Sequence, residues 1–239
     1  MATVILVRHG RTSANAAGTL AGRLPGVRLD EVGLEQATRT AERIAVVPLA
    51  AVVSSPLERC RQTARAIARA HPAAPRVSTD RGITECDYGE WQGRPLKELA
   101  REKLWTTVQA QPSAATFPGG ESLAAMQARA VAAVRRHDAA VEAEHGASAV
   151  WVAVTHGDIV KSLLADALGM HLDLFQRLGV DPASVSVIRY TGARPYVLAT
   201  TTHAGDLTWL ASTPGRRRKG RADAPVGGGA GPAPSPVRS

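Results

Sequence analysis

"TVILVRHGRTSAN" (residues 3–15) is an apolar run that stops abruptly at three residues of different chemistry, Arg8, His9 and Gly10. Residues 4–7 are rich in β-branched side chains and precede a glycine turn, which predicts a short buried strand. Arg8 and His9 then lie at the carboxyl end of that strand, where ligand crevices form in open α/β sheets. A cation beside a titratable imidazole suits an anion site, but this stretch alone fits a solvated loop with two polar residues equally well.

Outward from this stretch, strand-like and helix-like segments alternate up to about residue 210. Helices are expected over 33–45, 56–70, 119–145 and 158–169, and further strands over 50–55, 149–157, 184–190 and 195–202. The last two strands can pair as a hairpin near a sheet edge. Short connections and this alternation predict an α/β fold of three layers, α/β/α, in which a mostly parallel sheet carries helices on both faces.

Polar residues recur where three of these strands should end. The three stretches are LVRHG (6–10), VVSSPLERC (52–60) and VAVTHG (152–157). Parallel strands bring their carboxyl ends to one edge of the sheet, so Arg8, His9, Arg59 and His156 can share one crevice. Taken singly, each of these residues has an ordinary structural interpretation, but together they predict an anion site.

The net charge of +8 is concentrated at the C-terminal end of the chain. From Pro214 onward there are six basic residues against one acid, in a context rich in Gly, Pro and Ala. We therefore expect a domain over 1–212 and a disordered basic Gly/Pro-rich tail over 213–239. The tail is interpreted as a solvated terminus that can bind nucleic acid without sequence specificity, and its removal should leave turnover unchanged.

Cysteine usage and hydropathy indicate a cytoplasmic protein. Cys60 and Cys86 are the only cysteines and have no C-x-x-C spacing, so reduced thiols are expected. No run approaches the roughly 20 apolar residues of a membrane helix, and residues 4–7 are too short for a signal-peptide core. No membrane partner is expected, and the sequence carries no signal for an oligomeric state.

Five motifs occur in an order that resembles the histidine phosphatase superfamily, with its phosphoglycerate mutase-like fold, over roughly residues 3–205. They are RHGRTSAN (8–15), SSPLERCRQTA (54–64), TECDYGEWQG (84–93), PGGES (118–122) and VTHGD (154–158). The resemblance implies that the phosphoryl group is surrounded by Arg8, His9, Arg59 and His156. It also implies that Glu85 is the proton donor, and that Asn15 and Gly157 join the substrate-binding set. The stretch 21–37 departs from the family pattern, which leaves the contribution of Arg23 and Arg28 open.

These residue types can carry out phosphoryl transfer without a cofactor. A neutral His9 can attack phosphorus to give a phosphohistidine, while two arginines neutralise the phosphate in place of a metal. His156 can donate to the equatorial oxygens. A protonated Glu85 can supply the leaving oxygen with its proton and then activate water, and Asp87 can raise the pKa of Glu85 if it faces the same pocket.

Three functions are compatible with this set of residues. They are a phosphomonoesterase for a small phosphorylated metabolite, a phosphoglycerate mutase-type transferase, and a non-catalytic phosphate-binding module with a nucleic-acid-binding tail. A mutase must hold a second anionic group, and the stretch 94–117 lacks the paired arginines of the mutases, so the phosphatase branch is favoured. Apolar residues of that stretch are expected either to form a lid over the pocket or to pack on the body, namely Leu96, Leu99, Leu104, Trp105 and Phe117.

Overall fold

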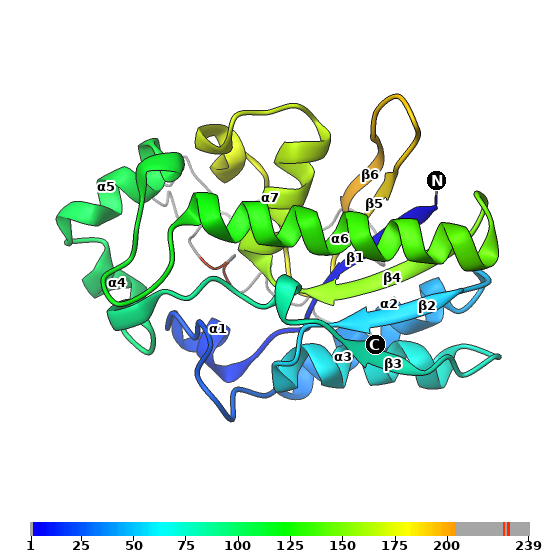
Figure 1. Ribbon diagram of the computed structural model, residues 1–239. Coiled ribbons are helices and arrows are strands. Elements are labelled where there is room, and N and C mark those ends of the chain that lie inside the picture. Colours follow the sequence, from blue (N-terminus) through cyan, green and yellow to red (C-terminus); the bar gives the residue numbers. More distant parts are fainter. Residues whose placement is uncertain (1, 204–226, 228, 230–239) are drawn as a thin grey trace, which may run out of the picture.

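A computed structural model describes residues 2–203, Gly227 and Gly229. Its centre is a six-stranded sheet (Figure 1). The strands are β1 (Thr3–Arg8), β2 (Ala51–Ser54), β3 (Val77–Thr79), β4 (Val150–Thr155), β5 (Val185–Arg189) and β6 (Tyr196–Thr202). They lie in the order β3-β2-β4-β1-β5-β6. The pairs β1–β4, β4–β2 and β2–β3 are parallel, whereas β5 pairs antiparallel with both β1 and β6.

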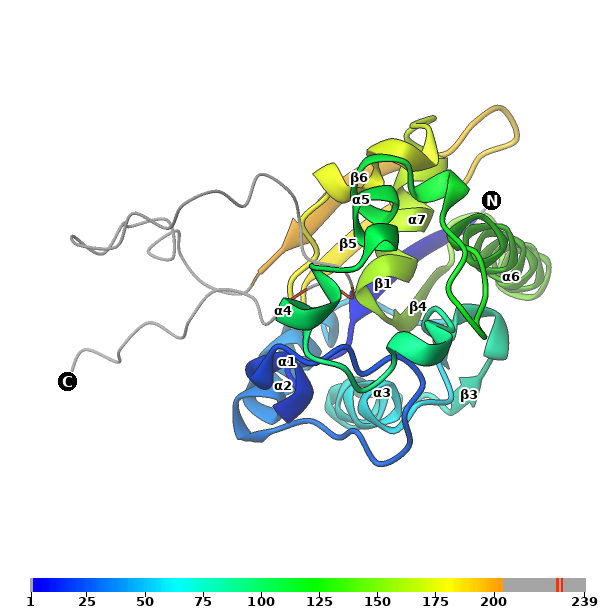
Figure 2. The same cartoon turned by 90° about the vertical axis from the view of Figure 1, so that its left-hand side faces the viewer.

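Helices cover both faces of this sheet, which Figure 2 shows nearly end-on. The α-helices are α1 (Ser13–Ala17), α2 (Glu31–Ile44), α3 (Glu58–Ala70), α4 (Leu96–Leu99), α5 (Lys103–Ala110), α6 (Leu123–His145) and α7 (Gly157–Ala167). Short 3-10 turns lie at Arg81–Ile83, Gly89–Trp91, Pro112–Ala114 and Leu172–Arg177. None of the helices described between residues 2 and 203 is both long and apolar enough to cross a membrane.

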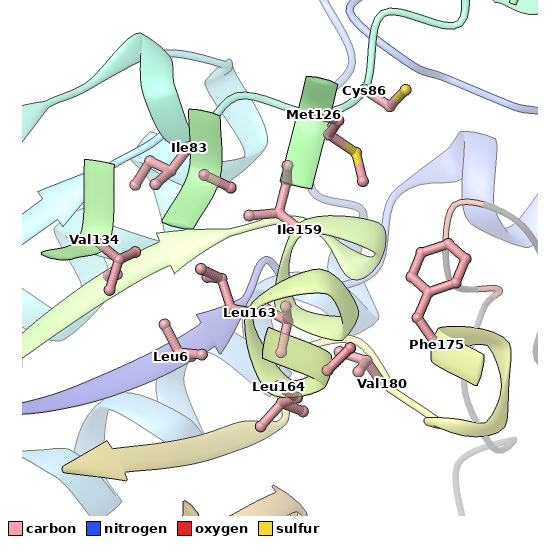
Figure 3. Close-up of a cluster of buried hydrophobic side chains, with 14 of the residues drawn as sticks. Leu6, Ile83, Cys86, Met126, Val134, Ile159, Leu163, Leu164, Phe175 and Val180 are labelled. Carbon is pink, nitrogen blue, oxygen red and sulfur yellow. The ribbon is translucent and has the colours of Figure 1, made fainter. Parts of the chain in front are cut away.

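The apolar run of β1 is continuous because both of its faces are buried, as is usual for a central parallel strand. Successive side chains point to opposite faces. Val4 and Leu6 belong to the core beneath α6 and α7, and Figure 3 shows Leu6 among side chains of those helices. Ile5 and Val7 belong to the core beneath α2 and α3. The sheet therefore lies between two apolar layers, and its polar residues are left at the strand ends.

The strand register sets the position of the two candidate histidines. Arg8 is opposite Thr155 in the parallel pair β1 and β4, so His9 and His156 leave the sheet side by side. Gly10 follows at a point where a Cβ atom would collide with the backbone of Gly33 near the start of α2. The glycine of the RHG motif is thus required by the close approach of α2 to the end of β1.

The predicted three-layer architecture is confirmed, including the C-terminal antiparallel hairpin. The pattern did not predict β3, a three-residue strand without a complete apolar face. The pattern also predicted that the long helix begins at residue 119, which is four residues too early. Ser122 caps α6 by accepting a hydrogen bond from Ala125 N–H, and Gly119 has a positive φ of 66°, so the helix begins at Leu123.

Candidate active site

His9 is neutral and presents an unprotonated nitrogen to the site. Its Nδ1 lies 2.7 Å from the carbonyl oxygen of Gly10, which only accepts, so Nδ1 carries the proton. Its Nε2 lies 3.2 Å from Arg59 Nε, which only donates, so Nε2 accepts. Burial and then the charges of Arg59 and Arg8 hold the pKa of His9 well below the usual 6.5. The imidazole is therefore in the tautomer and charge state of a nucleophile.

Arg59 is the second residue of α3 and connects the two histidines. Its Nη2 donates to the carbonyl of Gly22 at 2.7 Å and lies 3.3 Å from His156 Nδ1. Its Nη1 is buried and has no hydrogen-bond partner within the described part of the chain. A buried guanidinium nitrogen costs free energy unless an acceptor meets it. An anion beside His9 would supply that acceptor.

Arg8 is fully buried at the end of β1. Its Nη1 donates to the carbonyl of Val180 at 2.8 Å. Its Nη2 donates to the carbonyls of Gly229 at 2.7 Å and Gly227 at 3.3 Å. Burial lowers the pKa of Arg8 to about 10, so the side chain stays positively charged at neutral pH.

His156 follows β4 and faces His9, with ring centroids 5.2 Å apart. Its Nε2 lies 2.7 Å from the hydroxyl of Ser55, and its Nδ1 lies 4.0 Å from a carboxylate oxygen of Glu85. Burial and the charge of Arg59 hold the pKa of His156 well below 6.5. Because a serine hydroxyl can donate or accept, it can support either neutral tautomer of this ring.

Glu85 is buried, and burial together with the charge of Asp158 raises its pKa to about 7. One of its carboxylate oxygens accepts from the Cys86 N–H at 3.0 Å. The hypothesis that Asp87 raises this pKa is wrong: Asp87 is partly exposed and pairs with Arg23 at 3.3 Å. Near neutral pH, Glu85 can therefore both hold and release a proton.

The backbone of Glu85 is held by two arginines. Arg23 Nε and Arg129 Nη2 both donate to its carbonyl oxygen, at 2.8 and 3.1 Å. The same arginines pair with Glu121 of the PGGES motif. Arg23, whose role the sequence left open, thus positions the candidate acid. Arg28 instead pairs with Glu58 on the surface, 3.3 Å away.

Asn15 and Gly157 differ in their relation to the pocket. Asn15 lines it, and its Oδ1 accepts from the backbone and hydroxyl of Thr12 in a capping box, which leaves the amide NH₂ as the donor for a ligand. Gly157 is buried as the first residue of α7. It is not among the described residues that line the pocket, so its binding role stays a prediction.

The pocket itself has walls that the motifs did not identify. It is lined by His9, Thr12, Asn15, Gly18, Thr19, Leu20, Ala21, Gly22, Arg59, Glu85, Tyr88, Leu96, Gly227 and Gly229. Of the apolar residues expected in a lid, Leu96 alone is part of this lining. Leu99 and Phe117 are buried in the core, and Leu104 and Trp105 pack against it.

A buried polar cluster on α7 was also missed. Asp158 Oδ2 accepts from the Tyr88 hydroxyl at 2.7 Å, and Asp158 Oδ1 lies 3.4 Å from Lys161 Nζ. Lys161 also donates to Gln176 at 3.0 Å. The one signal in the sequence was the position of Asp158 directly after VTHG. Its charge, in contact with the pocket-lining residue Tyr88, had no predicted partner.

The cysteines are not nucleophiles in this site. Both are free and buried. Burial raises the pKa of Cys60 to about 12 and also raises the pKa of Cys86 well above its usual range. The reactive species of cysteine is the thiolate, which these environments disfavour.

The fold and this arrangement of two histidines, two arginines and a carboxyl group match a known family. The sequence pattern of the histidine phosphatase superfamily (branch 1) matches residues 4–202. The chain belongs to this superfamily.

The chain is similar to both phosphatases and a mutase. It is 32% identical over 214 residues to phosphoserine phosphatase 1 of Hydrogenobacter thermophilus, covering 87% of this chain and 96% of the relative. It is 32% identical over 192 residues to a probable phosphoglycerate mutase GpmB of Yersinia pestis, covering 80% and 86%. A phosphoserine phosphatase structure from Entamoeba histolytica shares the fold, with a TM-score of 0.75 at 22% identity over 85% of this chain and 98% of that one.

Proposed function

We propose that the protein is a phosphomonoesterase that hydrolyses a small phosphorylated metabolite through a phosphohistidine on His9. The observation that carries the proposal is the state of His9: a neutral ring whose Nε2 lone pair faces Arg59. A guanidinium nitrogen of Arg59 is buried there without an acceptor. A phosphoryl group placed at this point meets a nucleophile and a cation together.

In the first step, His9 Nε2 forms a bond to phosphorus while the bond from phosphorus to the alcohol oxygen breaks. Glu85 transfers its proton to that oxygen, so the leaving group departs as a neutral alcohol. In the second step, Glu85 as a carboxylate removes a proton from water, whose oxygen attacks phosphorus. The bond between nitrogen and phosphorus breaks, and inorganic phosphate and neutral His9 are released.

Ser55 is the positioning residue for His156 in this scheme. The Ser55 hydroxyl lies 2.7 Å from His156 Nε2 and orients the ring so that Nδ1 faces Arg59 and Glu85. Arg59 Nη2 only donates, so Nδ1 accepts from it and the ring proton lies on Nε2, where Ser55 accepts it. Once Arg59 Nη2 turns from Nδ1 to a bound phosphoryl group, the other neutral tautomer becomes available, in which Ser55 donates to Nε2 and Nδ1–H donates to a phosphoryl oxygen.

A hydrolase is favoured over a mutase by the cations of the pocket. Arg59 is the one cationic side chain among the described lining residues. Arg23 is paired with Asp87 and Glu121, and Arg94 is paired with Glu102 at 2.7 Å. A second anionic group on the substrate would thus find no cation ready in the described part of the pocket. Mutase-type transfer is the second candidate, because several relatives from Yersinia have a mutase name.

A panel of phosphorylated metabolites assayed for phosphate release tests the proposal. The interconversion of 2- and 3-phosphoglycerate is measured in parallel. Phosphate release from one class of monoester with no interconversion supports the phosphatase. Interconversion without net hydrolysis would instead make the protein a mutase, and binding without either reaction would leave a phosphate-binding module.

Activity should survive removal of metal ions. Arginines supply the positive charge in the proposed site, the part that Mg²⁺ plays in metal-dependent phosphoryl transfer. Phosphate release should therefore persist after exhaustive dialysis against a chelator, as measured by a colorimetric phosphate assay. Complete loss of activity that one divalent ion restores would contradict this prediction.

The pH dependence of kcat/KM should show a basic limb near pH 7. Glu85 has a pKa raised to about 7 and must be protonated in the first step, so kcat/KM for an alkyl phosphate falls as the pH rises through 7. His9, with its pKa well below 6.5, stays a neutral nucleophile throughout this range. The control is Glu85→Gln, in which the remaining activity should lack this limb. A basic limb that persists unchanged in the variant would assign the titration to another group.

We also propose a cytoplasmic location, supported by the two free buried thiols. A small phosphorylated metabolite is the proposed partner, and no specific nucleic acid. The basic stretch 216–221, which suggested non-specific nucleic-acid binding, lies outside the described residues.

A further inference from the structure

Two glycines from the end of the chain lie in the catalytic pocket. Gly227 and Gly229 both line it, although sequence reasoning placed no residue after 212 there. Their carbonyls accept from Arg8 Nη2, and the Gly227 N–H donates to Asp158 Oδ2 at 3.1 Å. Figure 1 shows them in red beside the start of α7. Disorder is expected for the tail over 213–239. Apart from Gly227 and Gly229, the residues of this tail lie outside the described part of the chain.

The backbone conformation and the surroundings of Gly227 favour a glycine. Its φ is 69°, a backbone conformation that favours glycine. A Cβ atom added there would lie 3.0 Å from Leu20 Cδ1 and 3.9 Å from the Tyr88 hydroxyl. The surrounding groups match a peptide backbone in polarity as well, because Arg8 donates to its carbonyls while Asp158 accepts from its N–H.

We propose that Arg8, Asp158 and Leu20 form a binding site for the chain's own glycine segment, and that this segment competes with the phosphoryl group for Arg8. The Nη2 group of Arg8 has two N–H donors, and two glycine carbonyls accept from it. Nη1 is directed to Val180. A phosphoryl oxygen can therefore accept hydrogen bonds from Nη2 only after the glycine carbonyls have moved away from it.

The charges make this competition reversible. A phosphate oxygen carries negative charge whereas a glycine carbonyl is neutral, so the guanidinium of Arg8 attracts a phosphate ester more strongly than the carbonyls and the ester can displace the segment. The buried carboxylate of Asp158 acts in the opposite direction, because it attracts the Gly227 N–H and repels an anion. Since the segment is tethered, its effective concentration at the site is on the order of millimolar. The apparent affinity for phosphate equals the affinity of the open site multiplied by the fraction of molecules in which the site is open.

The test uses the full-length chain with Gly227→Val, which introduces a side chain against Leu20 at a positive φ. The matched control is Gly220→Val, which changes a glycine of the same tail that lies outside the described residues. Binding of inorganic phosphate is measured by isothermal titration calorimetry, and KM is measured with an aryl phosphate. In Gly227→Val we expect phosphate to bind about 10-fold more tightly and KM to fall by a similar factor, as for a site closed in about nine molecules of ten. Gly220→Val should behave like the unmodified chain.

The inference rests on the proposed function only in taking Arg8 as a ligand of the phosphoryl group. Equal phosphate affinity in all three proteins would overturn it and leave the phosphatase proposal intact. Weaker binding in Gly227→Val would also overturn it, because the segment would then close over bound phosphate as part of the site. No phosphate binding in any of the three would overturn the inference and the proposed function together.

Discussion

Replacing Glu85 with Gln slows the hydrolysis of alkyl phosphate esters by about 10²–10⁴-fold, the usual contribution of a general acid. The amide keeps the shape of the side chain but has no proton to transfer to an alkoxide. An aryl phosphate loses less in the first step, because a phenolate leaves without much protonation. Phosphohistidine then forms on His9 and accumulates, since the second step lacks its base. Rapid quench with a radiolabelled aryl phosphate measures both effects.

A folding defect in this variant is distinguished by its thermal unfolding. The pKa of Glu85 in the folded protein lies above its ordinary 4.5, at about 7. The stability associated with its protonated form is therefore complete below pH 4.5 and is lost as the pH rises through 7. A neutral amide avoids this loss, so Glu85→Gln should unfold at an equal or higher temperature than the unmodified chain at pH 8. Full alkyl phosphatase activity in a folded Glu85→Gln would exclude Glu85 as the acid.

Replacing His9 with Ala abolishes the covalent intermediate and reduces turnover by on the order of 10⁴-fold or more, as expected when a nucleophile is removed. The labelled species of the Glu85→Gln experiment, which should be acid-labile and base-stable, must be absent in His9→Ala. Peptide mapping locates the label in the parent.

The matched control for His9→Ala is His137→Ala. His137 is partly buried and pairs with Asp80 at 2.7 Å, outside the pocket lining, so its loss should leave the label on His9. Label on Cys60, Cys86 or a serine would refute the histidine mechanism. Undiminished turnover of His9→Ala would remove His9 from the reaction.

The sequence predicts most of the fold because hydrophobic patterning and strand ends are local signals. The stretches LVRHG and VAVTHG each show an apolar strand followed by a histidine and a glycine, and the structure places the two strands side by side in register. Arg59 likewise comes shortly after an apolar strand, β2. These signals bring together His9, His156, Arg59 and Arg8, and the family resemblance adds Glu85, whose oxygen lies 4.0 Å from His156.

The remaining parts of the site depend on contacts that no local pattern encodes. Asp87 and Asp158 are both acids near a motif, and tertiary packing alone decides that Asp158 is buried near Glu85 while Asp87 pairs with Arg23. Ser55 cannot be distinguished in the sequence from an ordinary turn residue. Gly227 lies in a stretch whose low hydrophobicity indicates disorder, and its contacts with Arg8 and Asp158 are made through backbone atoms, which every residue has.

The pairing of β1 with β4 has a consequence for how the site arises during synthesis. His9 and Arg8 leave the ribosome early, but their neighbour His156 follows a strand from the second half of the chain, and β4 separates β1 from β2 in the sheet. A nascent chain therefore cannot assemble the phosphate site until β4 has emerged and inserted between strands that are already made. Such non-local pairing is slow to form. Because a ligand stabilises only the state that binds it, phosphate should protect the fully assembled sheet and no shorter intermediate, so phosphate binding can serve as a reporter of completed folding.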